Sequence, residues 1–283
     1  VFFLESPELL HAAGFADVSD RETLQVRLKG GTERDEVIVA EKPNANAPHV
    51  FSDSYLSPSP IDGEDKDWKP LLPKDAKLPL FLRDYANPFQ TAWWADRKTL
   101  YVQFRDNADE PGHPIGAFVD RVRNEIAGYK PKFIVLDLRL DQGGNFTKTA
   151  SLMKHIADDV EHVYVLTSAW TFSAGNVSLA LAKFHGGGKV TIVGEPVGDR
   201  MRIWAEGSDM VLPNSKLDVE YATGLHDYTK SCFGEPGCFW VMYYYPMQLK
   251  SWAPDIVVPY TFADYAAMRD PALDRVVFTM SKS

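Results

Sequence analysis

Cysteine is scarce in this chain, because its 283 residues include only Cys232 and Cys238. The two stand in the segment CFGEPGC, where the intervening Gly-Glu-Pro-Gly turn could bring the sulfurs within bridging distance. A small disulfide loop favours an extracytoplasmic protein, whereas two free thiols would be equally natural in the cytosol. Of these two interpretations we favour the disulfide, and with it a periplasmic or secreted location.

Basic charge and long apolar runs are also lacking. The formal net charge is −9 and the isoelectric point is near 5.3, so we expect neither a nucleic-acid partner nor binding to an anionic membrane. No apolar run reaches the roughly 18 residues that a membrane span needs. With 45% hydrophobic residues, the chain predicts a globular protein with a large core and room for a small satellite domain. We expect no cofactor and no metal, and the oligomeric state stays open.

The first 80 residues divide into two parts of different character. Residues 6–14 predict a short capped helix and residues 23–42 an amphipathic strand pair, so residues 1–42 form a small β-rich element. Across residues 43–80, Pro, Asp, Ser and Lys recur without periodicity, which indicates an irregular connection. The main domain is expected to span residues 81–283.

Strand and helix patterns alternate along this main domain. In chain order they are KTLYVQF (98–104), IGAFVDRVRNEIAG (115–128), KFIVLDLRL (132–140), FTKTASLMKHIADD (146–159), HVYVLTSAW (162–170), AGNVSLALAKF (174–184) and KVTIVGE (189–195). Such an alternation predicts an α/β fold of right-handed βαβ units, with a largely parallel sheet buried on both faces. The turn in LPNSKL predicts a hairpin appended to the sheet across residues 202–221, and residues 262–280 predict a final helix.

The serine of WTFSAGN, Ser173, stands between a predicted strand and a predicted helix. One interpretation is a helix N-cap, whose hydroxyl accepts a hydrogen bond from an amide of the first turn. The other is a nucleophile, because such a turn exposes the hydroxyl and the helix N-terminus stabilises negative charge. Taken alone, the local sequence favours the cap.

Gly143 and Gly144 follow the preceding predicted strand, at the carboxyl edge where open α/β sheets place their sites. The pair could simply permit a tight turn. It could also aim backbone amides at an oxyanion, since no side chain blocks the approach. If the two loops are neighbours, these amides and Ser173 converge on one point, which is the geometry that acyl transfer requires.

Four segments in a fixed order carry a resemblance: FIVLDLRLDQGGN, VYVLTSAWTFSAGN, TIVGEPVGDR and LPNSKLDV. They resemble the tail-specific (carboxyl-terminal processing) serine peptidases, whose family also includes the tricorn core protease and interphotoreceptor retinoid-binding protein. The similarity extends through WAPDIVVPYTFADYAAMRDPAL and covers residues 95–275. It implies a crotonase-like (ClpP/crotonase) core of ββα and βαβ units after the remnant of a small PDZ-like domain. It also implies a nucleophile at Ser173 and an oxyanion hole from the amides of Gly143 or Gly144 and of Ala174.

The chain departs from this family at the general base. The family takes its lysine base from the loop after VGE, and in this chain that loop reads VGDRMR and contains no lysine. Arg200 of this loop cannot accept the serine proton, because a guanidinium stays protonated. The acid of tricorn-type relatives near the PDI motif is also missing. Glu195 could orient a base or cap a turn. Four other side chains could act as the base, although we expect each of them to be a solvated surface residue: Lys148, Lys183, His185 and His226. We therefore expect the base to come from a segment outside this chain.

Three functions follow from these patterns. The resemblance favours a serine peptidase that hydrolyses peptide bonds in peptides or unfolded protein segments. The missing lysine favours a non-catalytic module that binds a peptide or an apolar ligand in the same cleft. A crotonase-like acyl-coenzyme A enzyme would share the oxyanion hole but has no need of Ser173. Since a general base is typically worth roughly 10²- to 10⁴-fold, we expect the chain alone to be a slow peptidase.

Overall fold

The structure is a computed structural model. It describes residues 7–28, 30–40, 56–58, 70–214, 216 and 218–282. The chain divides into two compact units, Val1–Tyr55 with Ile61–Asp67, and Leu56–Pro60 with Trp68–Ser283. Most of the expected irregular connection, residues 43–80, lies outside the described residues.

The first unit contains a short helix and a strand pair, as the sequence predicts. Helix α1 (Pro7–Ala12) precedes strands β1 (Arg21–Arg27) and β2 (Glu33–Val39). The two strands pair in antiparallel register, and every second residue of β1 is partly buried. This period of two is the signature of a half-buried strand.

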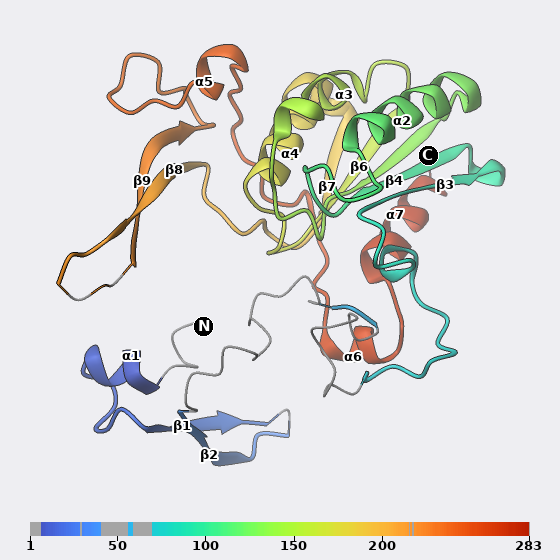
Figure 1. Ribbon diagram of the computed structural model, residues 1–283. Helices are drawn as coiled ribbons and strands as arrows, with labels where there is room; N and C mark the ends of the chain where they lie inside the picture. The colour runs from blue at the N-terminus through green and yellow to red at the C-terminus, as the bar shows by residue number, and fades with distance from the viewer. Residues whose placement is uncertain are drawn as a thin grey trace. The chain divides into compact units, whose positions relative to one another are not determined.

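The second unit is a mixed α/β structure built on a six-stranded, mostly parallel sheet in the order β10-β7-β6-β5-β4-β3 (Figure 1). Its strands are β3 (Phe89–Trp94), β4 (Thr99–Phe104), β5 (Phe133–Asp137), β6 (His162–Thr167), β7 (Val190–Gly194) and β10 (Ile256–Val257). Only β3 is antiparallel to its neighbour. The four parallel strands from β4 to β7 are those that the alternation predicts, whereas β3 and β10 were not predicted.

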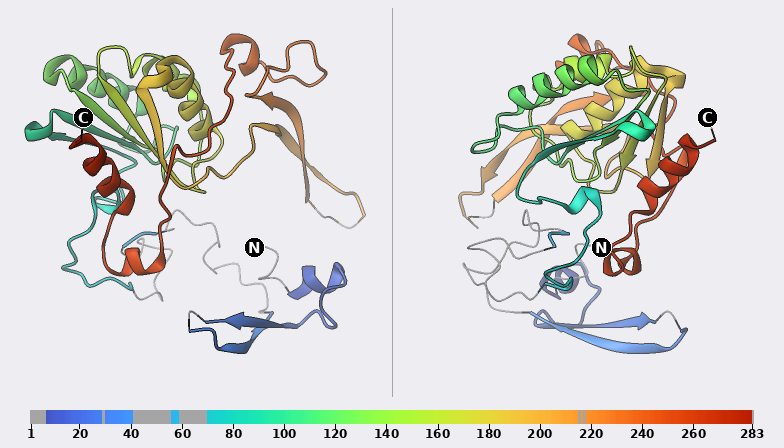
Figure 2. Two further views of the ribbon diagram at one scale, coloured as in Figure 1. Left: turned by 180° about the vertical axis from the view of Figure 1, so that it is seen from behind. Right: turned by 90° about the vertical axis from the view of Figure 1, so that its right-hand side faces the viewer.

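Helices bury both faces of the sheet (Figures 1 and 2). The connecting helices α2 (Ile115–Tyr129), α3 (Ala150–His155) and α4 (Ala174–Gly186) cover one face, and α7 (Pro271–Met280) covers the other. Consecutive parallel strands are also neighbours here, so crossovers of one hand place their helices on the same side. Side chains of β5 alternate accordingly: Leu136 packs in the core cluster of α2, α3 and α4, and Val135 packs in the cluster that contains α7.

Two predicted helices are shorter than expected. The final segment splits into α6 (Phe262–Ala266) and α7, because Pro271 starts a new helix that Asp270 caps by accepting from the Leu273 amide. The expected helix across residues 146–159 becomes the 3-10 turn η4 (Phe146–Lys148) and α3. The remaining short helical segments are η2 (Leu80–Leu82), η3 (Ala95–Arg97), η5 (Gly187–Lys189) and α5 (Val241–Tyr244).

The predicted hairpin forms a separate two-stranded sheet and is not a part of the main one. It consists of β8 (Arg202–Val211) and β9 (Asp218–Asp227). Cys232 and Cys238 form the disulfide that we favoured from their spacing. The closed loop returns to β9, where the Leu225 amide donates to Gly237 O at 2.7 Å.

Membrane-spanning helices are not found in the part of the chain that the structure describes, where every helix is too short or too polar to cross a bilayer.

Candidate active site

The loops that follow the neighbouring strands β5 and β6 meet at Gly143 and Ser173. A Cβ atom at Gly143 would lie 2.6 Å from Ser173 Cβ and 3.1 Å from the Ala174 nitrogen. Such separations are too short for any residue but glycine, and the φ of +120° at Gly143 also favours glycine. The convergence of the two loops, expected from their places at one sheet edge, is present.

Ser173 occupies the N-cap position of α4 without acting as a cap. Its side chain makes no capping hydrogen bond, and its backbone has a φ of 49° and a ψ of −118°. A non-glycine residue in this region costs on the order of 1–3 kcal/mol, which the surrounding contacts must offset. The residue is exposed. Of the two interpretations of the sequence, the structure does not support the N-cap.

The backbone amides around Ser173 differ in whether they already donate a hydrogen bond. The Gly143 amide donates to Asp141 Oδ1 at 3.1 Å. The amides of Gly144 and Ala174 have no hydrogen-bond partner among the described residues. They are therefore the two donors available to an incoming oxygen. The role of Gly143 is instead to let its loop pack closely against Ser173.

A buried polar cluster fixes the Gly143–Gly144 loop. Asn107 Nδ2 donates to both carboxylate oxygens of Asp141, at 2.8 and 2.7 Å. Thr149 Oγ1 donates to Asn107 Oδ1 at 2.8 Å, and the Asn107 amide donates to Gly143 O at 2.7 Å. Burial raises the pKa of Asp141 well above its usual range, while the bonds from Asn107 and Gly143 act in the opposite direction. Neither Asn107 nor Asp141 was singled out from the sequence.

A pocket with a volume of about 70 Å³ opens beside Ser173. A cavity that holds benzene measures about 150 Å³, so this space suits a small side chain rather than a ring. Phe146, Val177, Phe239 and Val241 give part of its lining an apolar character. Asn176 also lines it, and neither polar atom of this buried side chain has a hydrogen-bond partner among the described residues.

His226 lines the same pocket, and it is buried rather than a solvated surface residue as we expected. Its Nδ1 lies 3.2 Å from the Tyr228 hydroxyl, and its ring stacks on Phe239 with centroids 4.7 Å apart. Its Nε2 is 3.5 Å from Glu206 Oε1 without forming a hydrogen bond. Desolvation by burial lowers the pKa of His226 to about 4, so its imidazole is neutral at physiological pH.

The other possible bases lie outside the lining of this pocket. Lys148 pairs with Asp109, and His185 is exposed. Lys183 donates to Val190 O at 2.6 Å and to Asp255 Oδ2 at 3.0 Å. Arg200, in the loop where the sequence resemblance implies a lysine, is exposed too. Glu195 accepts from the Tyr260 amide at 3.1 Å, which is a structural role in a turn.

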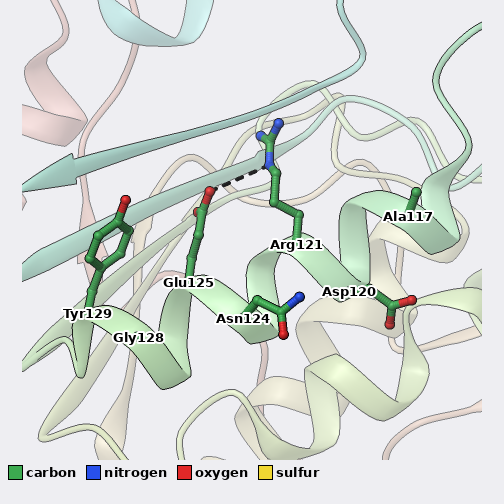
Figure 3. A pocket seen from close by; sticks show the side chains of 7 residues that line it. All are labelled: Ala117, Asp120, Arg121, Asn124, Glu125, Gly128 and Tyr129. Carbon is green, nitrogen blue, oxygen red and sulfur yellow. Dashed lines mark ion pairs between the residues drawn. The ribbon is translucent and has the colours of Figure 1, made fainter.

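A second hollow lies along the outer face of α2 (Figure 3). Its labelled side chains all come from this one helix, and they include an ion pair between Arg121 and Glu125 with 3.6 Å between the charged atoms. Thr91 of β3 holds this pair, because its hydroxyl donates to Glu125 Oε1 at 3.1 Å and accepts from Arg121 Nη2 at 3.2 Å. The charged groups of this hollow are thus paired with one another, which is typical of a structural surface contact rather than of a catalytic site. In the described ranges, no group of three or more His, Cys, Asp or Glu side chains is arranged to hold a metal ion.

Comparison with protein-family models and with curated protein sequences finds no match. Among solved structures, a candidate peptidase from Parabacteroides merdae is 16% identical with a TM-score of 0.46, over 69% of this chain and 64% of that one. A candidate S41 protease from Bacteroides fragilis is 16% identical with a TM-score of 0.45, over 69% and 57%. A photosystem II D1 C-terminal processing protease is 16% identical with a TM-score of 0.39, over 61% and 48%.

The chain thus spans less than two thirds of the length of each of these three proteins. Because the TM-scores are all below 0.5, these likenesses carry no conclusion about function.

Proposed function

We propose that this chain is a serine peptidase that hydrolyses peptide bonds in peptides or unfolded protein segments, with Ser173 as the nucleophile. One observation carries the proposal. An exposed serine that does not cap its helix lies beside two amides, of Gly144 and Ala174, that lack a hydrogen-bond partner in the described part of the chain. Nucleophile and oxyanion donors are the pair that acyl transfer requires.

In this proposal the oxyanion hole consists of the amides of Gly144 and Ala174. The Ala174 amide stands at the N-terminus of α4, where the helix dipole favours negative charge. Backbone donors held in a folded loop need no reorganisation as the charge develops, and each is typically worth roughly 10²- to 10³-fold in rate. This chemistry requires neither a metal nor a cofactor.

The surroundings of Ser173 suit a peptide substrate. The pocket accepts a small apolar side chain, and Asn176 offers both a donor and an acceptor, which match the C=O and N–H of a peptide group. Exposed aromatic side chains flank the site: Phe172 lines the pocket, and Trp240 contacts Phe146 with ring centroids 6.0 Å apart. Aromatic surfaces of this kind bind extended apolar segments.

The proposal also covers the folds of the two units and the location of the protein. We assign the second unit to the crotonase-like fold and the first unit to the remnant of a PDZ-like domain. An extracytoplasmic location agrees with the Cys232–Cys238 disulfide, because such bonds persist mainly in oxidising compartments.

Hydrolysis of a fluorescently labelled, unfolded casein tests the function. We expect turnover by the unaltered chain, none above background by Ser173→Ala, and normal turnover by Ser151→Ala, which alters an exposed serine on α3. Casein binding without hydrolysis by both the unaltered chain and Ser173→Ala would contradict the proposal and indicate a binding module.

A further inference from the structure

His226 is the titratable side chain of the Ser173 pocket whose surroundings most resemble those of a base. Its side chain is 6% exposed and its Nε2 has no hydrogen-bond partner in the described ranges. A buried polar atom normally has a partner, because leaving it without one costs about 1–3 kcal/mol. This unpartnered nitrogen belongs to a side chain that lines the same pocket as the uncapped Ser173, which indicates a functional use.

We propose that His226 is the general base of this site, so that the chain itself contains the proton acceptor that its sequence was expected to lack. The inference rests on the proposed serine peptidase function and adds to it a residue from β9. The loop that carries the lysine in the family therefore need not supply the base.

Tyr228 and Glu206 act as positioning residues. The Tyr228 hydroxyl lies 3.2 Å from Nδ1. In the tautomer that this proposal requires, Nδ1–H donates to that hydroxyl and Nε2 keeps its lone pair for Ser173. Burial raises the pKa of Tyr228, so this hydroxyl stays neutral. Stacking on Phe239, next to the Cys232–Cys238 disulfide loop, holds the plane of the ring.

Glu206 supplies a charge that favours the imidazolium once it forms. Its Oε1 is 3.5 Å from Nε2, and a carboxylate at this distance stabilises a positive imidazole. The backbone of Glu206 has a φ of 46°, and the pairing of β8 with β9 is interrupted at this residue. Strained backbone of this kind is often found at functional sites.

The proton transfers balance over two steps. Ser173 Oγ bonds to the carbonyl carbon while its proton moves to His226 Nε2, and the carbonyl oxygen becomes an oxyanion held by the amides of Gly144 and Ala174. The imidazolium then gives this proton to the departing amine as the C–N bond breaks. Water next bonds to the acyl carbon and passes a proton to Nε2, which returns it to Ser173 Oγ as the ester bond breaks.

The pH dependence follows from the titratable groups that line the pocket together with the imidazole. These are Glu206 from β8, Tyr228 from β9, and Asp199 from the loop before β8, which lines the same pocket. Burial lowers the pKa of His226 to about 4, so the base is available throughout the neutral range. A lysine base would instead give rates that rise into the alkaline range.

The test measures the rate at which a fluorophosphonate labels Ser173 in the full chain and in His226→Gln, with His185→Gln as the matched control. We expect roughly 100-fold slower labelling in His226→Gln, since a general base contributes roughly 10²- to 10⁴-fold, and an unchanged rate in His185→Gln. Added imidazole should restore labelling in His226→Gly. Glu206→Gln should lower the pH at which the rate is half-maximal.

The outcomes separate this inference from the proposed function. No labelling of Ser173 in the unaltered chain contradicts the serine peptidase itself. Labelling of the unaltered chain with an equal rate in His226→Gln contradicts only the base. If His226→Gln is unfolded by circular dichroism, the unaltered chain decides: a rate that is constant from pH 5.5 to 8 supports His226, and a rate that climbs steadily over this range contradicts it.

Discussion

Asn107 and Asp141 hold two loops of the site together, because the Asn107 side-chain amide donates to both oxygens of the buried Asp141 carboxylate at 2.8 and 2.7 Å. The same carboxylate accepts from the Gly143 amide, and Asp141 O accepts from the Phe172 amide at 3.0 Å. The geometry around Ser173 therefore depends on a polar cluster that contains no atom of the proposed nucleophile or oxyanion hole.

Asn107→Ala should destabilise the chain by about 2–3 kcal/mol, since it removes two hydrogen bonds to the buried carboxyl group of Asp141 and leaves that group without them. Urea denaturation followed by circular dichroism measures this change. Asn124→Ala, at an exposed position of α2, should alter the free energy of unfolding by less than about 0.5 kcal/mol. Equal free energies of unfolding for the two variants would show that the polar cluster does not stabilise the fold as described.

Gly143→Ala should lower the labelling of Ser173 by about 100-fold or more, because the added methyl group would stand 2.6 Å from Ser173 Cβ and displace it. The backbone strain at a φ of +120° adds to this effect. The matched control is Gly116→Ala in α2, where an added Cβ meets nothing within 4 Å. We expect that variant to label normally, and normal labelling of Gly143→Ala would contradict the packing described here.

The main fold and the meeting of Gly143 with Ser173 could be predicted from local patterns. Continuous Val, Ile and Leu runs specify buried parallel strands, and loops at one edge of such a sheet are neighbours. The N-cap alternative could not be decided from sequence, because it depends on the φ of 49° at Ser173.

The burial of His226 could not be predicted from local patterns. It stands in an exposed-looking hairpin, and only the packing of β9 and of the disulfide loop around it makes it buried. By contrast, the break between α6 and α7 had a local signal in Asp270 and Pro271, which form a standard helix start.

Arg139→Met should destabilise the chain by about 3–5 kcal/mol, because it leaves two buried carboxylates without a counter-charge. Arg139 Nη1 lies 2.7 Å from Asp270 Oδ1, Arg139 Nη2 lies 2.5 Å from Asp137 Oδ2, and all three side chains are nearly inaccessible to solvent. Arg123→Met, which removes an exposed pair with Asp120 on α2, should cost less than about 1 kcal/mol. Thermal unfolding of both variants makes the comparison, and similar losses would refute the buried network's role.

The free energy of unfolding should fall in acid partly through His226. Its pKa is about 4 in the folded chain against 6.5 for an ordinary histidine, so the unfolded chain binds more protons between these values and stability declines as the pH falls through them. At pH 4.5 this loss amounts to about 2–3 kcal/mol relative to pH 7.5. His226→Gln should lack that part of the decline, and identical pH dependence in both chains would contradict the burial of a neutral imidazole.

The proposed peptidase function depends most directly on the identity of the nucleophile. The decisive measurement is mass spectrometry of the chain after reaction with a fluorophosphonate, followed by proteolysis and location of the adduct. We predict one adduct per chain, on Ser173, and none on Ser173→Ala treated in the same way. An unmodified Ser173, or an adduct that Ser173→Ala forms equally well, would contradict the account.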